Sequence, residues 1–408
     1  MKNIFLLLIF TAVTVFASAQ PAWQRKTDYG NFPYPLHRTA AVGFSIGTGG
    51  YIACGYDSAD YKRTCWRYDQ ALDQWIQMTS LGNSTGSGLG RDVTVSFVIG
   101  NSAYVGTGQG GAPYLKDFWE FNAPVNTWFQ KLNLTGSGRR GAVAFSINGK
   151  GYVGTGQDSL GMKSDFWEYN PAIGTWSQKA NFAGGARRLA VAFAINGKGY
   201  VTTGDANSFK NDMWEYDPIG NTWVQKANFP GTPRYSAAVF VINNRAYVGS
   251  GYDNTLNNTR DFWEYDPMSN FWAQKASFFG TARSNASAFS IGNKGYFGTG
   301  FDSVPCSDFW EFDPTFTGID EPDYSDASVN VYPNPVTDYA HFNISSSQEI
   351  KEAEIRVYDL QGKLVRAKTF SGNEIDIERG DLPNGTYIYT INDKKQYHIG
   401  NGKLILVN

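Results

Sequence analysis

The stretch 139–179 reads RRGAVAFSINGKGYVGTGQDSLGMKSDFWEYNPAIGTWSQK. Apolar runs rich in β-branched and aromatic residues (AVAFSI, YVGTG, DFWEY and TWSQK) alternate in it with turn residues such as NGKG and Asn-Pro. This alternation is typical of short antiparallel strands joined by turns. The stretch therefore predicts one small four-stranded sheet.

The same unit occurs six times in the chain. Each copy has an arginine, then a phenylalanine six residues later and a tyrosine seven residues beyond that; the arginines are Arg38, Arg91, Arg139, Arg187, Arg234 and Arg283. The expected third strand carries a tryptophan in every copy, and in the first five copies a second one follows nine residues later. Repeats of 47 to 53 residues are typical of solenoids, propellers and arrays.

One tryptophan decides between these architectures. The sixth copy lacks its second tryptophan, whereas Trp23 stands before the first copy in the matching setting WQRK. Only a closed ring lets such a displaced segment complete the last sheet, and closure also removes exposed strand edges. We therefore expect an all-β chain in which residues 20–29 close a six-bladed β-propeller that spans residues 20–314.

The repeated unit resembles the kelch repeat in its spacing of aromatic, turn and tryptophan residues, as in YVGTG…DFWEYNPAIGTW. The resemblance covers about residues 20–314 and occurs in all six copies. One feature departs from the kelch pattern, which ends the second strand with adjacent glycines. Here that position reads Gly154-Thr155-Gly156, which places the chain in a variant group.

The N-terminus predicts export. Residues 1–19 have the pattern of a secretory signal peptide, with Lys2, an apolar stretch from Ile4 to Phe16, and a small-residue cleavage site at residues 17–19. That stretch is too short to span a bilayer comfortably, and we expect no transmembrane segment in the mature chain. The formal charge of −2 argues against a general nucleic-acid-binding protein.

After residue 314 the repeat ends. We expect a polar linker over residues 315–328 and a small β-sandwich over residues 329–408, where alternating apolar residues and Asn-Gly turns occur. This second module resembles the C-terminal sorting domain of type IX secretion cargo. The matching residues include Tyr332, Pro333, Asn334, Pro335, Gly385, Tyr387 and Lys403.

That resemblance implies recognition by the outer-membrane secretion machinery and removal by a sortase-like peptidase that cuts within residues 315–330. The cargo would then be released or attached to surface lipopolysaccharide. The alternative is a permanent accessory sandwich that binds carbohydrate.

Three cysteines occur, Cys54, Cys65 and Cys306, an odd number for an exported protein. Cys54 ends the expected second strand of the first blade and Cys65 begins the third, so the two could form a disulfide. Three buried thiols are the alternative. No Cys-x-x-Cys or Cys/His cluster suggests a metal, and we expect no cofactor.

The second-to-third loops vary in length and sequence among the copies, whereas the first-to-second and third-to-fourth turns are uniform. Variable loops on a rigid scaffold are where recognition residues concentrate. The hypothesis is an anionic glycan or acidic peptide bound at this end of the ring, by the six arginines and by residues that follow the closing glycines. The latter candidates are Tyr56, Gln157, Asp158, Tyr252 and Phe301. The alternative is that residues repeated six times hold the blades together.

We therefore expect a non-catalytic, surface-displayed or released binding protein for a glycan or protein ligand. One alternative is an enzyme similar to kelch-type sialic-acid mutarotases, with Asp158 or Asp253 as the acid/base group. Another is a structural adhesin with no small ligand. Copper-radical oxidase chemistry needs several histidines, and the propeller contains only His37.

Overall fold

The computed structural model describes residues 22–30, 35–82, 88–111, 114–315, 327–346, 349–360, 363–393 and 398–407. The chain divides into two compact units, residues 1–318 and 319–408, and each is described by itself. Strands dominate both units, and the one helical element among the described residues is a 3-10 turn, η1 (Ala123–Val125). The predicted signal peptide and most of the predicted linker lie outside the described residues.

Six four-stranded antiparallel sheets make up the described part of the N-terminal unit. The first three sheets are β2 (Val42–Ile46), β3 (Gly49–Ala53), β4 (Cys65–Asp69) and β5 (Gln74–Met78); β6 (Val95–Ile99), β7 (Ser102–Gly106), β8 (Phe118–Asn122) and β9 (Thr127–Lys131); and β10 (Val143–Ile147), β11 (Lys150–Gly154), β14 (Phe166–Asn170) and β15 (Thr175–Lys179).

The remaining three repeat this arrangement. They are β16 (Val191–Ile195), β17 (Lys198–Thr202), β18 (Met213–Asp217) and β19 (Thr222–Lys226); β21 (Ala238–Ile242), β22 (Arg245–Gly249), β24 (Phe262–Asp266) and β25 (Phe271–Lys275); and β26 (Ser287–Ile291), β27 (Lys294–Gly298), β28 (Phe309–Phe312) and β1 (Trp23–Lys26). Two-residue strands form two further small ladders: β12 (Gln157–Asp158) with β13 (Gly161–Met162), and β20 (Arg234–Tyr235) with β23 (Tyr252–Asp253).

The strand β1 completes the last sheet, as the displaced tryptophan predicts. It pairs antiparallel with β28, with Trp23 opposite Phe312. The Trp23 ring is 2% exposed, lies 4.9 Å from the Phe312 ring and donates from Nε1 to the Ala276 carbonyl. The first strand of the unit is therefore fixed to the last by both backbone pairing and aromatic packing.

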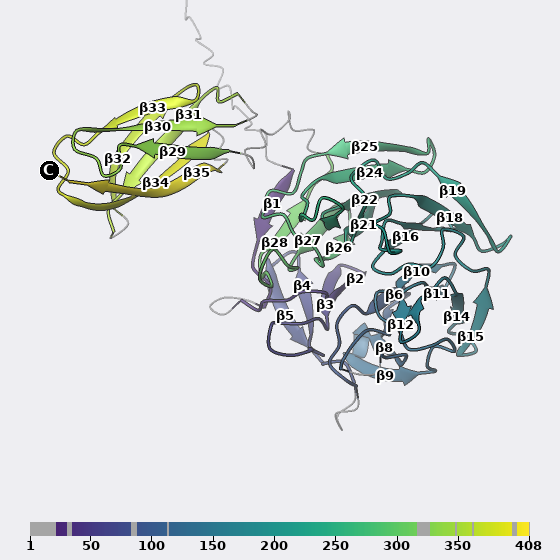
Figure 1. Ribbon diagram of the computed structural model, residues 1–408. Coiled ribbons are helices and arrows are strands. Elements are labelled where there is room, and N and C mark those ends of the chain that lie inside the picture. Colours follow the sequence, from purple (N-terminus) through teal and green to yellow (C-terminus); the bar gives the residue numbers. More distant parts are fainter. Residues whose placement is uncertain are drawn as a thin grey trace, which may run out of the picture. The chain divides into compact units, whose positions relative to one another are not determined.

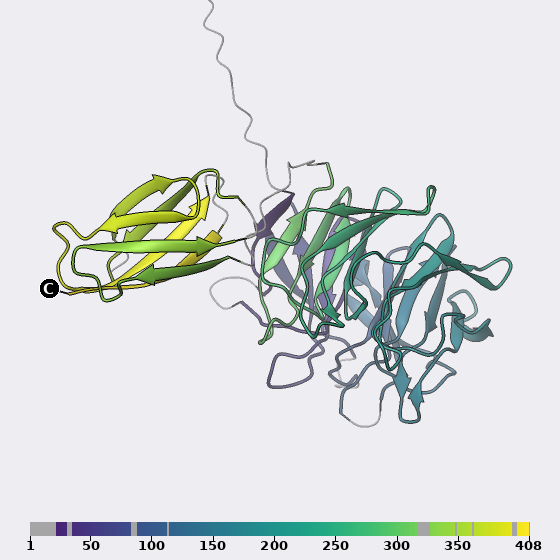
Figure 2. The ribbon, with the colours of Figure 1, turned by 45° about the horizontal axis from the view of Figure 1, so that its top comes forward.

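The first strands of the six sheets, β2, β6, β10, β16, β21 and β26, lie nearest a common centre (Figures 1 and 2). Each contacts the next, and β26 also contacts β2. Near their N-terminal ends, a cycle of six backbone hydrogen bonds runs from sheet to sheet. It starts with Val93 N–H to the Ala40 carbonyl and returns with Ala40 N–H to the Asn285 carbonyl.

Glycines let the sheets pack closely. A Cβ atom on Gly151 would lie 2.1 Å from the ring of Phe97, which belongs to the preceding sheet. The repeated Gly-Tyr pair of the second strand thus leaves space for the neighbouring sheet's phenylalanine. Within its own sheet, the phenylalanine of the first strand stacks on the tyrosine opposite it in the second strand. Phe97 and Tyr104 are an example, with ring centroids 5.1 Å apart.

The C-terminal unit contains two sheets over one core. The three-stranded sheet consists of β29 (Ser328–Tyr332), β30 (Tyr339–Ser345) and β33 (Glu374–Glu378). The four-stranded sheet consists of β32 (Leu364–Phe370), β31 (Ala353–Tyr358), β34 (Gly385–Asp393) and β35 (His398–Leu406). Alternate apolar residues of both sheets, among them Phe342, Ile355 and Tyr389, bury one another in a shared cluster.

Candidate functional site

The six repeated arginines lie in the interior of the N-terminal unit, each with 2% or less of its surface exposed. Five of them form two-pronged ion pairs with an aspartate of the same sheet, at N–O distances of 2.5–3.0 Å. The pairs are Arg91–Asp117, Arg139–Asp165, Arg187–Asp212, Arg234–Asp261 and Arg283–Asp308.

Each of these aspartates also accepts a hydrogen bond from the indole N–H of the tryptophan two residues later, as Asp165 does from Trp167 at 2.7 Å. Although burial opposes ionisation, hydrogen bonds and charge from the arginines keep the pKa values of Asp117, Asp165 and Asp212 below the usual range. These contacts correspond to the scaffold alternative. The guanidinium groups of these five arginines face carboxylates within the protein, whereas the hypothesis from the sequence has all six arginines contact an anionic ligand.

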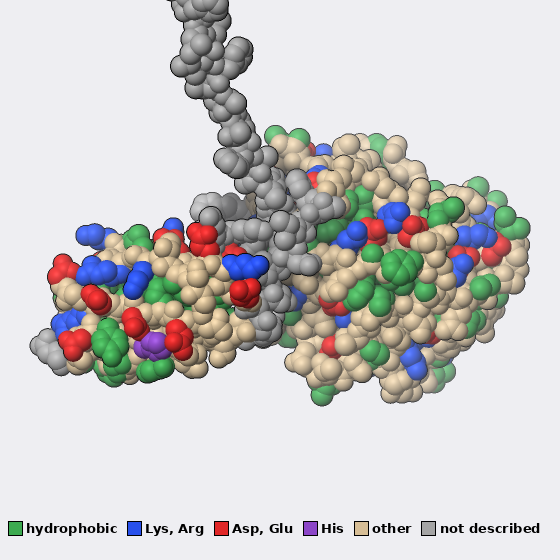
Figure 3. Space-filling view, turned by 90° about the horizontal axis from the view of Figure 1, so that it is seen from above, with side chains coloured by type: hydrophobic (Ala, Val, Ile, Leu, Met, Phe, Trp, Pro, Cys, Tyr) green, Lys and Arg blue, Asp and Glu red, His purple; other side chains and the backbone are tan. Residues whose placement is uncertain are grey.

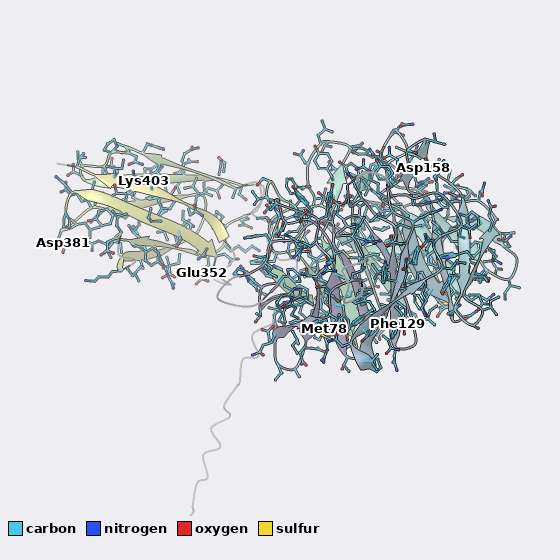
Figure 4. All side chains as sticks on the ribbon, turned by 90° about the horizontal axis from the view of Figure 1, so that it is seen from below. Met78, Phe129, Asp158, Glu352, Asp381 and Lys403 are labelled. Atoms are coloured by element: carbon cyan, nitrogen blue, oxygen red, sulfur yellow. The ribbon has the colours of Figure 1, made fainter. Side chains whose placement is uncertain are left out.

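The aspartates after the closing glycines hold loops in place. Asp158, in the two-residue strand β12 (Figure 4), is 5% exposed and bonds to Lys163, to the Ser137 hydroxyl and to the Leu160 N–H. Burial alone would raise the pKa of Asp158, but these donors outweigh it and lower the pKa to about 2. Asp253 accepts from the hydroxyls of Thr232 and Thr255 in the same way. Both carboxylates are ionised at neutral pH, and both already have hydrogen-bond partners within the protein.

Six pairs of residues line the varied end of the ring. The residue after each buried arginine pairs through backbone hydrogen bonds with the residue after each closing glycine. We call these residues the rim: Thr39 with Tyr56, Asp92 with Gln109, Arg140 with Gln157, Arg188 with Asp205, Tyr235 with Tyr252, and Ser284 with Phe301. The rim thus brings together the predicted candidates Tyr56, Gln157, Tyr252 and Phe301.

One arc of the rim is polar. Arg140 donates from Nη1 to Gln109 at 2.6 Å, and Arg188 donates to Gln157 at 2.6 Å and to Asp205 at 3.0 Å. Such an arc can orient a polar ligand without strongly attracting a polyanion. Away from the rim, on the side of the N-terminal unit seen in Figure 3, acidic and basic side chains lie beside one another with no large area of one sign.

The other arc is aromatic. The rings of Tyr235 and Tyr252 lie 5.6 Å apart, and Phe209 meets Tyr235 edge-on at 4.9 Å. Phe301 is 39% exposed. Exposed aromatic faces beside polar groups provide flat surfaces on which a ligand can stack.

Between the arcs lies a hollow of about 320 Å3, lined by Tyr56, Ala59, Asp60, Tyr61 and Asp92. The rings of Tyr56 and Tyr61 are 5.4 Å apart at 55°. Asp92 presents a buried Oδ1 that has no hydrogen-bond partner among the described residues. Burial raises the pKa of Asp92 to about 6, although the charge of Arg140 opposes the shift.

Four of the five residues of this hollow, Ala59, Asp60, Tyr61 and Asp92, are not among the candidates from the sequence. A signal for Asp92 exists, because the position after the repeated arginine varies among the copies although the arginine itself does not. Tyr61 has no comparable signal: its loop has the same length as those of the second and third copies, and Tyr114 stands at the same position in the second copy. The hollow is therefore defined by loop conformation as much as by the repeat.

The predicted Cys54–Cys65 disulfide is not formed in the structure, where both cysteines and Cys306 are free and buried. Cys65 pairs instead with Ala53 across β3 and β4, and Cys54 lies one residue beyond β3 with φ of 66°. Burial raises the pKa of the Cys54 thiol to about 11, which keeps it protonated. Within the described residues no cluster of three or more histidine, cysteine or acidic side chains could hold a metal.

In the C-terminal unit the Tyr-Pro-Asn-Pro motif contacts the last strand. The amide of Asn334 donates to the Lys403 carbonyl and accepts from the Ile405 N–H, each at 3.0 Å. Lys403 itself lies on β35 with an exposed side chain (Figure 4). Tyr387 donates its hydroxyl proton to the Pro383 carbonyl at 2.9 Å. The motif thus joins the beginning and the end of this unit.

Residues 330–406 match a family described as the secretion system C-terminal sorting domain. The C-terminal unit is therefore a type IX sorting domain, which interacts with the secretion machinery and sends the protein across the outer membrane to the cell surface or the extracellular space. No curated protein matches the chain. A search of the described residues for a helix long and apolar enough to cross a membrane finds none.

Proposed function

We propose that the N-terminal unit is a six-bladed β-propeller of the kelch type and that it binds a glycan at the rim. The cyclic contacts of six sheets and the strand supplied by the N-terminus support the architecture. The type IX signal would deliver this propeller to the outside of the cell as a recognition protein.

The observation that carries the binding proposal is the hollow beside Asp92. Tyrosine faces stack on the apolar faces of sugar rings, and a carboxylate can accept hydrogen bonds from sugar hydroxyls. Tyr56, Tyr61 and Asp92 offer these groups together in about 320 Å3. Arg140, beside Gln109, adds a cation that could contact an acidic sugar.

A glycan array probed with the full chain tests this proposal. Tyr61→Ala and Asp92→Asn should each reduce binding to the recognised glycan at least tenfold, because each removes a group that contacts the sugar. Ile219→Ala is the matched control, since Ile219 is 91% exposed in the turn between β18 and β19 at the other end of the strands.

Equal binding by Tyr61→Ala, Asp92→Asn and wild type would contradict this site. Binding of an acidic peptide instead of any glycan would assign the rim to a protein ligand. Absence of any ligand, with surface delivery intact, would favour the structural adhesin.

A second candidate function is sialic-acid mutarotation, which the raised pKa of Asp92 favours. A carboxyl group with a pKa of about 6 can exchange a proton near neutral pH, whereas Asp158 is held ionised by its donors. Proton NMR of sialic-acid anomerisation tests this activity. Acceleration by wild type that is lost in Asp92→Asn would support the enzyme, and an unchanged rate with wild type would exclude it.

The cleavage predicted for the sorting domain also belongs to this proposal. A sortase-like peptidase would cut within residues 315–330 and leave the propeller released or attached to lipopolysaccharide. Deletion of residues 319–408 should hold the propeller in the periplasm, and a truncated chain that still reached the surface would contradict the assignment. Mass spectrometry of the delivered protein would show whether its C-terminus lies in that segment.

A further inference from the structure

The first sheet lacks the carboxylate that its five counterparts share. In those sheets an aspartate two residues before the third-strand tryptophan neutralises the buried arginine and accepts the indole N–H. In the first sheet the corresponding residue, two before Trp66, is Thr64. The arginine remains, and Arg38 is only 2% exposed.

Several donors are left without an acceptor around this position. Arg38 donates from Nη2 to the Thr64 hydroxyl over 3.4 Å, a long hydrogen bond to a neutral group. Its Nε and Nη1 atoms, the indole Nε1 of Trp66 and the hydroxyl of Tyr29 are buried without a partner within the described residues. In the other five sheets the arginine Nη1 also donates to a backbone carbonyl, as Arg139 does to Thr155 at 3.0 Å.

No described acidic side chain forms an ion pair with Arg38, and the neighbouring polar groups are neutral. Burial raises the pKa values of Tyr29, Cys54 and Cys65, so none of them supplies a negative charge near pH 7. A buried guanidinium without a counter-charge is strongly unfavourable, and so is each buried donor without an acceptor. An anion from outside the chain would supply both the missing charge and the missing acceptor.

The size of the site favours a single-atom anion. Tyr29 is fully buried, and the unpartnered atoms of Arg38 and Trp66 are also shielded from solvent, which excludes a bulky ligand. Cys65 also stands where the other five sheets carry a larger side chain. The larger residues are Phe118, Phe166, Met213, Phe262 and Phe309.

We propose that the first sheet holds a halide ion, chloride under physiological conditions, bound by Arg38, Trp66 and Tyr29 in place of the missing aspartate. All of the free groups are donors, and a spherical anion can accept from them together. The backbone of Arg38 also donates to the Cys306 carbonyl and accepts from the Gly300 N–H, both in the loops of the last sheet. The ion therefore lies at the junction where the last sheet meets the first.

Thermal unfolding of the full chain in different sodium salts at constant ionic strength tests this site. Wild type should melt roughly 2–5 °C higher in about 100 mM chloride or bromide than in gluconate, because an ion that binds only the folded state stabilises it. Thr64→Asp restores the aspartate of the other sheets. It should abolish the halide dependence and raise the melting temperature in gluconate.

Thr64→Asn is the matched control for Thr64→Asp, since it has the same size but adds no charge, and it should not raise the melting temperature in gluconate to the value of Thr64→Asp. Crystals of the full chain grown in bromide give an independent readout through anomalous scattering, with a peak expected beside Arg38 and none beside Arg139. Equal melting temperatures of wild type in halide and gluconate, or the absence of that peak, would overturn the proposal.

Discussion

Arg139 and Arg140 are consecutive in the chain, yet their side chains have opposite surroundings. Arg139 is fully buried and bonded to Asp165, as are its equivalents in four other sheets, whereas Arg140 lies on the rim and contacts Gln109. The position of Arg139 is the same in all six copies, and the position of Arg140 holds five different residue types. The difference teaches that, in a ring of repeats, a repeated charge supports the scaffold and a varied neighbour is the place to look for a ligand.

The strongest way to test this comparison is to remove a buried arginine. Arg139→Ala should lower the free energy of unfolding by about 3–5 kcal/mol, because it leaves Asp165 without its counter-charge. Guanidinium-induced unfolding measures the change. A loss below about 1 kcal/mol would mean that the buried pair does not support the fold.

Removing both charges of the Arg139–Asp165 pair should lower the free energy of unfolding less than removing one of them. Arg139→Met combined with Asp165→Leu deletes the whole ion pair, and the remaining cost of about 1–3 kcal/mol arises because Trp167 Nε1 loses its acceptor. The same unfolding experiment, arranged as a double-mutant cycle, gives the coupling energy. Additive losses would show that the two side chains act independently.

Stability should depend on pH with opposite signs at two aspartates, Asp92 on the rim and Asp165 beside the buried Arg139. Asp92 on the rim has a folded-state pKa of about 6, above the ordinary value of 3.8, so its ionisation destabilises the fold above about pH 6, and that penalty disappears as the pH falls toward 4. Asp92→Asn should therefore be more stable than wild type at pH 7, by about 1–2 kcal/mol after allowance for partial exposure, and equal to it near pH 4.

Asp165 has a lowered pKa, so its contribution to stability is present above the ordinary value and is lost as the pH falls through the folded-state value. Asp165→Asn should be less stable than wild type at pH 7, and the difference should shrink in acid. Melting temperatures between pH 3 and pH 8 measure both variants. If both variants differed from wild type in the same direction at pH 7, the contrast between scaffold and rim would be contradicted.

The smallest effect on stability is expected at Arg140, where the rim is polar. Arg140→Ala should change the free energy of unfolding by less than about 1 kcal/mol, because a partly exposed polar contact contributes little. Its effect should appear instead in binding of an acidic glycan. If Arg140→Ala and Arg139→Ala destabilised the protein equally, the two positions could not be assigned different roles.

Much of the sheet arrangement could be predicted because strand, turn and aromatic residues recur at fixed spacing. The place of Trp23 opposite Phe312 follows from counting tryptophans, and the structure confirms this pairing. The sorting domain could be recognised for a similar reason, since its motifs occur at both ends of one compact module.

The partners of the arginines were harder to predict, because the acceptor lies far along the chain. Asp165 follows Arg139 by 26 residues, and only the fold brings the two together. The signal was present nonetheless, as an aspartate two residues before the tryptophan in five of six copies. The hollow could not be predicted, because Tyr61 is positioned by a loop held by the Asp57 carboxylate, which accepts from the Asp60 N–H.

The strand that completes the last sheet comes from the beginning of the chain, and this matters for what can be cut away afterwards. The backbone of Asp313, just beyond β28, donates to the Ala22 carbonyl, and the outer edge of that sheet is already covered by β1. A cut between the two units, as proposed above, would therefore remove no strand from the last sheet. The described strands of the N-terminal unit would keep the hydrogen-bonded edges that they had before the cut.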